Sequence, residues 1–136
     1  MIVYACSDLI FATKVRATAE ALAIATRPTR DAEALRRRLN RVDDGKGNDP
    51  VTGVIIDLDL GDAALALIRQ VAADPGPAGT SGPPAPRPQV VAFGSHTATA
   101  LLDSARAAGA DFVLPRSQFT ANLPTILQRL AAAPQP

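Results

Sequence analysis

Polar side chains follow the apolar, strand-like stretches of this sequence, and their types could support chemistry at one shared site. Asp57 directly follows the β-branched run Val54–Ile56, and Asp59 comes two residues later. Open α/β sheets collect such residues at the carboxyl ends of their strands, around one crevice. The other residues at predicted strand ends are Cys6, Ser7, Asp8, Gly94, Ser95 and Arg116. Asp57 and Arg116 would form an ion pair there; the structural alternative is that Asp57 only caps a turn.

Five apolar stretches predict the strands that position this crevice. They are Ile2–Cys6, Leu22–Thr26, Val54–Ile56, Val90–Phe93 and Phe112–Leu114. Helical patterns of apolar residues alternate with these strands along the chain. Strict alternation predicts an α/β fold of the flavodoxin-like, doubly wound type. Its five-stranded parallel sheet has the order 2-1-3-4-5, with helices on both faces.

The ends of the predicted helices can also be placed from the sequence. The expected capping residues are Ser7 or Asp8, Asp31, Asp62 and Thr120 at helix starts, and Gly109 at a helix end. Pro124 is tolerated in the first turn of the last helix. Phe119 is expected on the loop before that helix, either tucked into the edge of the core or anchoring a partner.

Composition limits the class of protein. The chain has 136 residues, of which 47 % are hydrophobic, and we expect one domain over residues 1–133 with a Pro/Gly-rich internal loop at 73–89. A formal net charge of +1 argues against nucleic acid as a partner, and the arginines from Arg36 to Arg41 are expected on a solvated helix face. No signal peptide pattern and no apolar run of about 20 residues is present, so we expect a cytoplasmic protein without a membrane span.

Two motifs resemble the receiver domain of two-component response regulators, the CheY-like fold, and the resemblance covers nearly the whole chain. The segment VIIDLDLGD is similar to the strand that carries the family's phosphoacceptor aspartate, which implies that role for Asp57. The run AAGADFVLPR, residues 107–116, resembles the family's segment ending in an invariant lysine, where this chain has Arg116. The same spacing puts Gly94 at the family's Thr/Ser switch position.

This sequence departs from the family pattern at most of the phosphotransfer positions. The acidic pair that holds Mg²⁺ in receivers aligns with Cys6 and Ser7, while Asp8 is displaced by one residue. Gly94 lacks the switch hydroxyl, although Ser95 is adjacent, and Arg116 keeps the lysine's charge but not its shape. Without metal ligands the phosphoryl transfer should fail, because it depends on charge neutralisation and positioning. We therefore expect a pseudo-receiver that holds no metal or other cofactor and is not an enzyme.

Three functions remain open from the sequence. The first is a signalling module of two-component type that acts by protein–protein contact without Mg²⁺-dependent phosphorylation. The second is a phosphorylatable stand-alone response regulator that uses Asp57, and the third is a small ligand-binding or enzymatic flavodoxin-like protein. The resemblance implies a protein partner, such as a histidine kinase, on the face formed by residues 97–108, 112–116 and 120–130. A homodimer is a further alternative. No output domain is expected after the last helix. The sequence identifies neither the partner, the role of the 73–89 loop nor the reactivity of Cys6.

Overall fold

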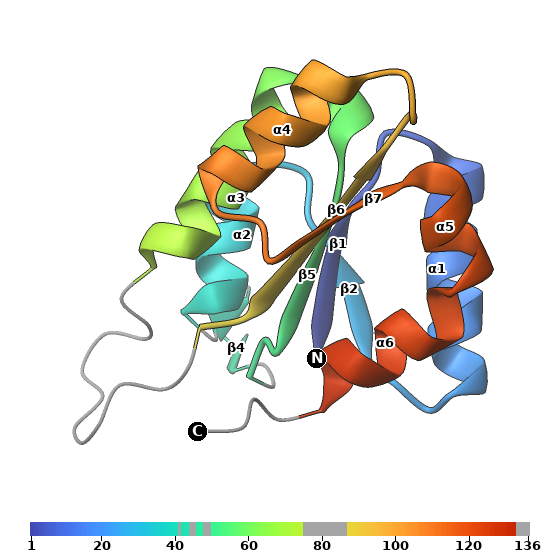
Figure 1. Cartoon of the computed structure of the whole chain (residues 1–136). Helices are drawn as coiled ribbons and strands as arrows, with labels where there is room; N and C mark the ends of the chain where they lie inside the picture. Colours follow the sequence, from blue (N-terminus) through green and yellow to red (C-terminus); the bar gives the residue numbers. More distant parts are fainter. Residues whose placement is uncertain (41, 44–45, 48–49, 75–86, 133–136) are drawn as a thin grey trace.

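The fold is a parallel sheet between two layers of helices (Figure 1). The computed structural model describes residues 1–40, 42–43, 46–47, 50–74 and 87–132. Its strands are β1 (Ile2–Ala5), β2 (Thr26–Pro28), β3 (Val42–Asp43), β4 (Lys46–Gly47), β5 (Gly53–Asp57), β6 (Gln89–Gly94) and β7 (Phe112–Pro115). Its helices are α1 (Leu9–Ala21), α2 (Ala32–Leu39), the 3-10 turn η1 (Leu58–Leu60), α3 (Asp62–Ala73), α4 (Thr99–Ala108), α5 (Arg116–Ala121) and α6 (Leu123–Ala131).

The main sheet confirms the predicted architecture. Its order is β2-β1-β5-β6-β7, and every neighbouring pair is parallel. When the five strands of this sheet are numbered along the chain, this is the predicted order 2-1-3-4-5. The short strands β3 and β4 form a separate antiparallel pair. In the described part of the chain, no helix is both long enough and apolar enough to cross a membrane.

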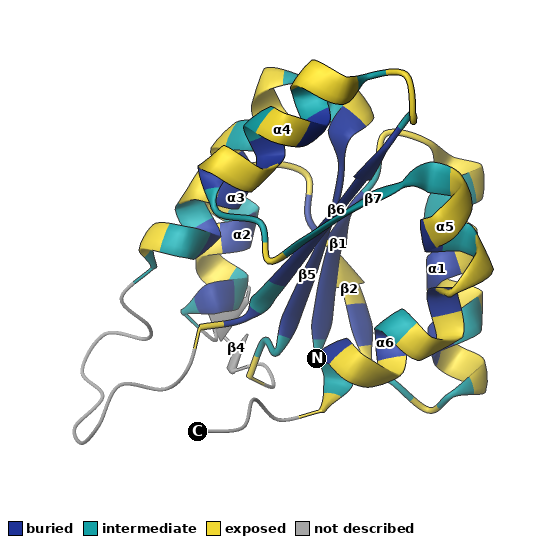
Figure 2. Ribbon diagram, in the orientation of Figure 1, coloured by how far each residue is buried: buried dark blue, intermediate teal, exposed yellow. Residues whose placement is uncertain are grey.

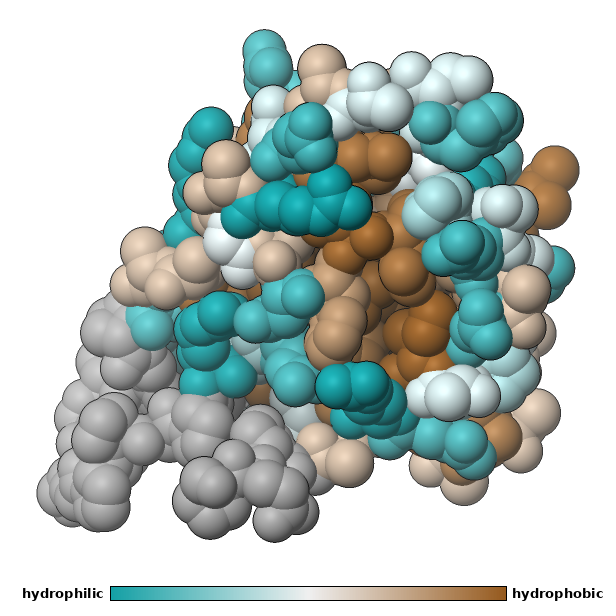
Figure 3. Space-filling view, viewed as in Figure 1, coloured by the Kyte–Doolittle hydropathy of each residue, from teal (hydrophilic) through white to brown (hydrophobic). Residues whose placement is uncertain are grey.

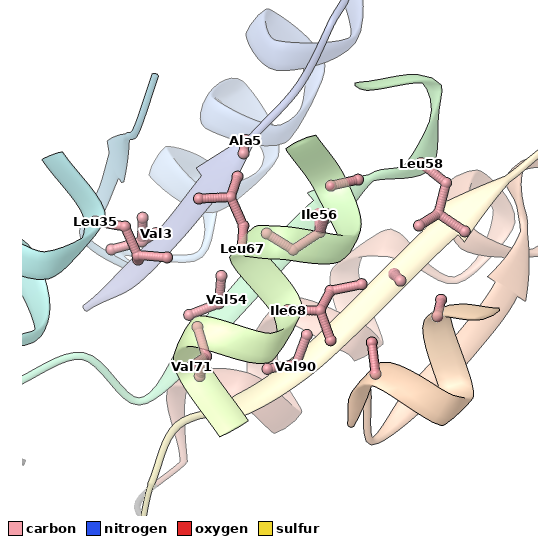
Figure 4. Packing of buried hydrophobic residues seen from close by; sticks show 14 of the residues in the cluster. Val3, Ala5, Leu35, Val54, Ile56, Leu58, Leu67, Ile68, Val71 and Val90 are labelled. Carbon is pink, nitrogen blue, oxygen red and sulfur yellow. The ribbon is translucent and has the colours of Figure 1, made fainter. Parts of the chain in front are cut away.

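The central strand β5 is apolar on both sides because helices cover both faces of the sheet. Val54 and Ile56 pack in one cluster with side chains of α2, α3 and α4 (Figure 4). Ile55 packs in a second cluster with α1 and α6, because successive side chains of a strand point to opposite faces. All three side chains are fully buried, and Figure 2 shows the inner strands β1, β5 and β6 buried along most of their length. Each such side chain contributes roughly 2 kcal/mol from the apolar surface that it removes from water.

The second strand lies further along the chain than its predicted position, Leu22–Thr26. Helix α1 continues to Ala21, and Leu22 and Ala23 then form a turn in which their N–H groups donate to Ala19 and Glu20. The backbone therefore becomes extended only at Thr26, where β2 begins. Pro28 is tolerated in β2 because this strand is at the edge of the sheet.

The helix starts agree only in part with the predictions. The carboxylates of Asp8 and Asp31 accept from the N–H groups of Ile10 and Ala34 at 2.8 Å, so both act as N-caps. Gly109 ends α4 with a φ of 117°, a conformation that suits glycine. The prediction that Asp62 caps a helix is wrong, because Asp62 is the first residue of α3 and makes no capping hydrogen bond.

The prediction for the last helix was also wrong at its start. Thr120 lies inside α5 rather than capping α6, and Pro124 is in the first turn of α6 as expected. The side chain of Asn122 donates to the carbonyl of Gln118 at 2.9 Å, and the chain turns there from α5 into α6. Phe119 is therefore helical and fully buried, which excludes it as an exposed anchor for a partner. Residues 75–86 of the predicted loop at 73–89 lie outside the described part of the chain. Arg41 also lies outside it.

Asp111 clamps the start of β6 at the amino ends of the strands. Its carboxylate accepts from the N–H of Val90 at 2.7 Å and from both terminal nitrogens of Arg87 at 3.0 and 3.2 Å. The N–H of Asp111 in turn donates to the carbonyl of Val90 at 2.9 Å. This aspartate belongs to the AGAD stretch of the sequence, and its contribution is structural.

Asp111→Ala should lower the free energy of unfolding by about 2 kcal/mol, because it leaves the Val90 N–H without its acceptor. Arg87→Ala removes only the partly exposed ion pair and should cost less than about 1 kcal/mol. Urea unfolding of both variants measures the difference. Equal losses would mean that the ion pair, and not the bond to Val90, carries the stabilisation.

Candidate functional site

Asp57 lies at the centre of the residues gathered at the carboxyl ends of the strands. It ends β5, and its side chain is buried, with 1 % of its surface exposed. One carboxylate oxygen, Oδ1, accepts from the N–H of Asp59 at 2.9 Å, which begins the turn η1. Asp57 therefore caps this turn, as the structural alternative predicts, and it also lies at the carboxyl end of β5 among the residues of the crevice.

Ser7 binds the second oxygen of Asp57. Its backbone N–H donates to Oδ2 at 3.0 Å, and its hydroxyl donates to the same oxygen at 2.7 Å. The parallel pairing of β1 with β5 places Ser7 beside Asp57, because the two strands end at the same edge of the sheet. A buried carboxylate needs such donors, since burial of an unsatisfied charge is costly.

Arg116 joins both acidic residues of the turn after β5. Its Nη2 atom donates to Asp59 Oδ2 at 2.5 Å and to Asp57 Oδ1 at 3.4 Å. The predicted contact with Asp57 is therefore present, but Asp59 is the closer partner. The hydrogen bond to Asp59 and the negative charges of Asp59 and Asp57 raise the pKa of Arg116 above its ordinary value.

Three phenylalanines form an aromatic floor beneath Arg116. The ring of Phe93 stacks on Phe119 with centroids 4.3 Å apart and on Phe11 with centroids 4.7 Å apart. The guanidinium carbon of Arg116 lies 5.7 Å from the ring centroid of Phe93 and 5.9 Å from that of Phe11. Aromatic faces attract cations at such distances, so the floor helps to hold the guanidinium over the acidic turn.

Cys6 and Asp8 flank this network without binding Asp57. The pKa of the Cys6 thiol is raised to about 12, chiefly by burial and also by the negative charges of Asp57 and Asp8, which outweigh the lowering effect of Arg116. The thiolate is therefore disfavoured, which argues against a reactive cysteine. The Asp8 carboxylate caps α1 through its bond to Ile10.

Comparison with solved structures identifies the fold. The receiver domain of the sensor histidine kinase PA1611 from Pseudomonas aeruginosa matches with a TM-score of 0.70 at 17 % identity, covering 96 % of this chain and 95 % of that one. A response regulator receiver domain from Bermanella marisrubri matches with a TM-score of 0.68 at 17 % identity, covering 96 % and 97 %. The chain has the fold of a receiver domain. The NtrX receiver domain from Brucella abortus agrees, with a TM-score of 0.67 at 17 % identity over 96 % of this chain and 98 % of that one. No protein-family model and no curated protein matches the sequence.

There is little space for a side chain at Gly94, the residue that aligns with the Thr/Ser switch position of receivers. A Cβ atom on Gly94 would lie 3.2 Å from the Cβ of Leu58, the buried residue next to Asp57. The adjacent Ser95 does not replace the missing hydroxyl at Asp57, because its Oγ shares a hydrogen bond of 2.8 Å with the hydroxyl of Thr97. Gly94 and Ser95 therefore lie at the crevice as expected, but neither contributes a hydrogen bond to the network around Asp57.

The residues present do not fit the Mg²⁺ that receivers hold at this edge. Mg²⁺ prefers oxygen ligands in octahedral geometry, and the two positions of the acidic pair carry a thiol and a hydroxyl that already donates to Asp57. Asp59 is engaged with Arg116, and Asp8 is engaged with its helix. Among the described residues, no group of three or more His, Cys, Asp or Glu side chains is arranged to hold a metal ion.

The sequence could not show two parts of this site. The aromatic floor comes from α1, β6 and α5, and its phenylalanines are too far apart in sequence for spacing to reveal the stack. The closer pairing of Arg116 with Asp59 depends on the turn η1, which points the Asp59 side chain to the guanidinium. The only early signal was the number of acidic residues in the segment DLDLGD.

Proposed function

We propose that this chain is a pseudo-receiver, a signalling module that acts by protein–protein contact and not by phosphorylation of Asp57. The main support is the saturation of the Asp57 carboxylate. Both of its oxygens accept hydrogen bonds from Ser7, Asp59 and Arg116, so no oxygen is left free for metal or phosphoryl chemistry. A phosphoryl group on Asp57 would have to break these bonds before any new stabilisation began.

Charge balance supports the same proposal. Arg116 supplies a cation to Asp57 and Asp59, which in receivers would be the work of the lysine and the metal together. A transferring phosphoryl group needs compensation for the charge that it develops, and the guanidinium is already committed to two carboxylates. In this proposal, the negative charge of Asp57 and Asp59 is balanced by Arg116 of the protein itself and not by a bound metal or a phosphoryl group.

The proposed contact surface is the face made by residues 97–108, 112–116 and 120–130. It contains α4, β7, the two ends of α5 and most of α6, and β7 is half-buried along its length. The partner on this face is proposed to be a signalling protein, such as a histidine kinase, or a second copy of the chain. Both alternatives use the same exposed edge of the sheet.

Incubation with acetyl phosphate and Mg²⁺, followed by intact-mass measurement, tests the proposal. We expect no phosphoryl adduct on this chain, whereas a phosphorylatable receiver treated in parallel should gain one. Beryllofluoride with Mg²⁺ should likewise leave the amide spectrum unchanged. A phosphoryl adduct that disappears in Asp57→Asn would overturn the proposal and establish the phosphorylatable regulator instead.

A further inference from the structure

An apolar groove runs along the open edge of the sheet between β7 and α6. Its volume is about 220 Å³, which leaves room for an aliphatic side chain. Phe112 and Leu114 of β7 form one wall, and Ile126 and Leu130 of α6 form the other. Figure 3 shows this face hollowed and hydrophobic between the polar surfaces of α4 and α6.

The groove exists because α6 packs mainly toward the centre of the sheet. Its contacts are chiefly with α1, β1 and β5, while the short helix α5 covers β6 and the carboxyl end of β7. The side chains of Phe112 and Leu114 point to the α6 side of the sheet but remain only half-buried. On this face of the sheet, the amino-terminal half of β7 is thus left without a helix directly over it, while α4 packs on its other face.

The two edges of the sheet differ in how well they resist added strands. The outer residues of β2 are Arg27 and Pro28, both exposed, and a charge and a proline discourage further pairing. At the other edge, β7 carries no charge, its proline is the last residue, and no described strand pairs with the outer side of Phe112–Leu114. Such an edge can accept an extended segment through main-chain hydrogen bonds, with alternate side chains entering a neighbouring groove.

One charge marks the rim of the groove. Arg129 of α6 is the charged residue among those that line it, and its guanidinium carbon lies 4.5 Å from the ring centroid of Phe112. Within the described part of the chain, no carboxylate is paired with Arg129. A ligand that fits both features is apolar along its length and carries a carboxylate where it passes this guanidinium.

We propose that β7 and this groove bind an extended, apolar segment of a partner protein that presents a carboxylate to Arg129. This inference rests on the proposed function, because it places the partner on the same face, and it adds the chemical class of the segment. The segment adds as a strand beside β7, places an aliphatic side chain between Phe112 and Ile126, and pairs its carboxylate with Arg129.

Two synthetic peptides test the inference by amide chemical shifts of the ¹⁵N-labelled full chain. Both are short, capped at each end and alternate leucine with threonine; one carries a glutamate and the other a lysine at the same position. We expect the glutamate peptide to shift the amides of residues 112–114 and 125–129. Arg129→Ala should weaken its binding about fivefold, the size of a partly exposed ion pair.

Matched variants separate the groove from general stickiness. Arg69→Ala removes an exposed arginine of α3, on the opposite layer of helices, and should leave peptide binding unchanged. Thr125→Trp places a bulky side chain at the exposed rim of the groove and should abolish binding without disturbing the core.

Three results would overturn the inference. Equal binding of both peptides would show a merely apolar pocket, and shifts confined to other surfaces would show another site. Shifts of 112–114 that grow with protein concentration alone would assign the edge to a second copy. Each of these leaves the phosphorylation result untouched, so the failure of this inference can be told from the failure of the proposed function.

Discussion

Replacement of Asp57 by alanine is expected to lower the free energy of unfolding by about 3 kcal/mol. The side chain is buried and accepts from the N–H groups of Ser7 and Asp59, from the Ser7 hydroxyl and from Arg116. Alanine leaves these donors without their acceptor at the junction of β1 and β5. Urea unfolding at neutral pH measures the loss.

Asp59→Ala is the matched control for Asp57→Ala. It removes the closer partner of Arg116, but the Asp59 side chain is 49 % exposed, so solvent screens the lost attraction. We expect a loss of less than about 1 kcal/mol from this variant. Should the two variants prove equally stable, the buried network around Asp57 would not be a main support of the fold.

Gly53→Ala is expected to cost about 2 kcal/mol, because α6 crosses β5 too closely for a methyl group. A Cβ atom at this position would lie 2.7 Å from the Cβ of Leu130, an atom close to the helix backbone that cannot move alone. The strand would have to push α6 away from β1 and β5. Thermal unfolding at a fixed heating rate compares the variant with the parent chain.

Gly94→Ala provides the comparison, since Gly94 is also a strand glycine but meets Leu58 at the longer distance of 3.2 Å. A small displacement of Leu58 relieves a contact at this distance, whereas the contact at Gly53 is too short to occur without a larger shift, so the loss should be clearly smaller than at Gly53. If Gly94→Ala were the more damaging of the two, close approach of α6 would not explain the glycine at position 53.

The order of strands could be predicted from the sequence because each strand is a short apolar run followed by polar residues. The same logic brought Asp57 and Arg116 together, since both follow strands that end at one edge of a parallel sheet. Neither prediction needed side-chain detail. Periodicity and turn residues were sufficient, and the observed order of the sheet confirms them.

The parts that could not be predicted depend on local competition. An alanine-rich stretch such as residues 19–25 suits a helix as well as a strand, and the turn that ends α1 at Leu22 and Ala23 takes up the start of the predicted strand. Thr120 could cap a helix, but Asn122 and the burial of Phe119 decided the boundary instead. The saturation of Asp57 depends on the rotamers of Ser7 and Arg116, about which the sequence carries no signal.

The clamp formed by Arg87 and Asp111 has a consequence for how this chain can vary. It fixes Val90, the second residue of β6, from Asp111, the residue just before β7, so the register of β6 is set by its neighbour in the sheet. Changes in the length of the chain between α3 and β6 should therefore leave the geometry at the opposite end of the sheet, where Asp57 and Arg116 lie, unchanged.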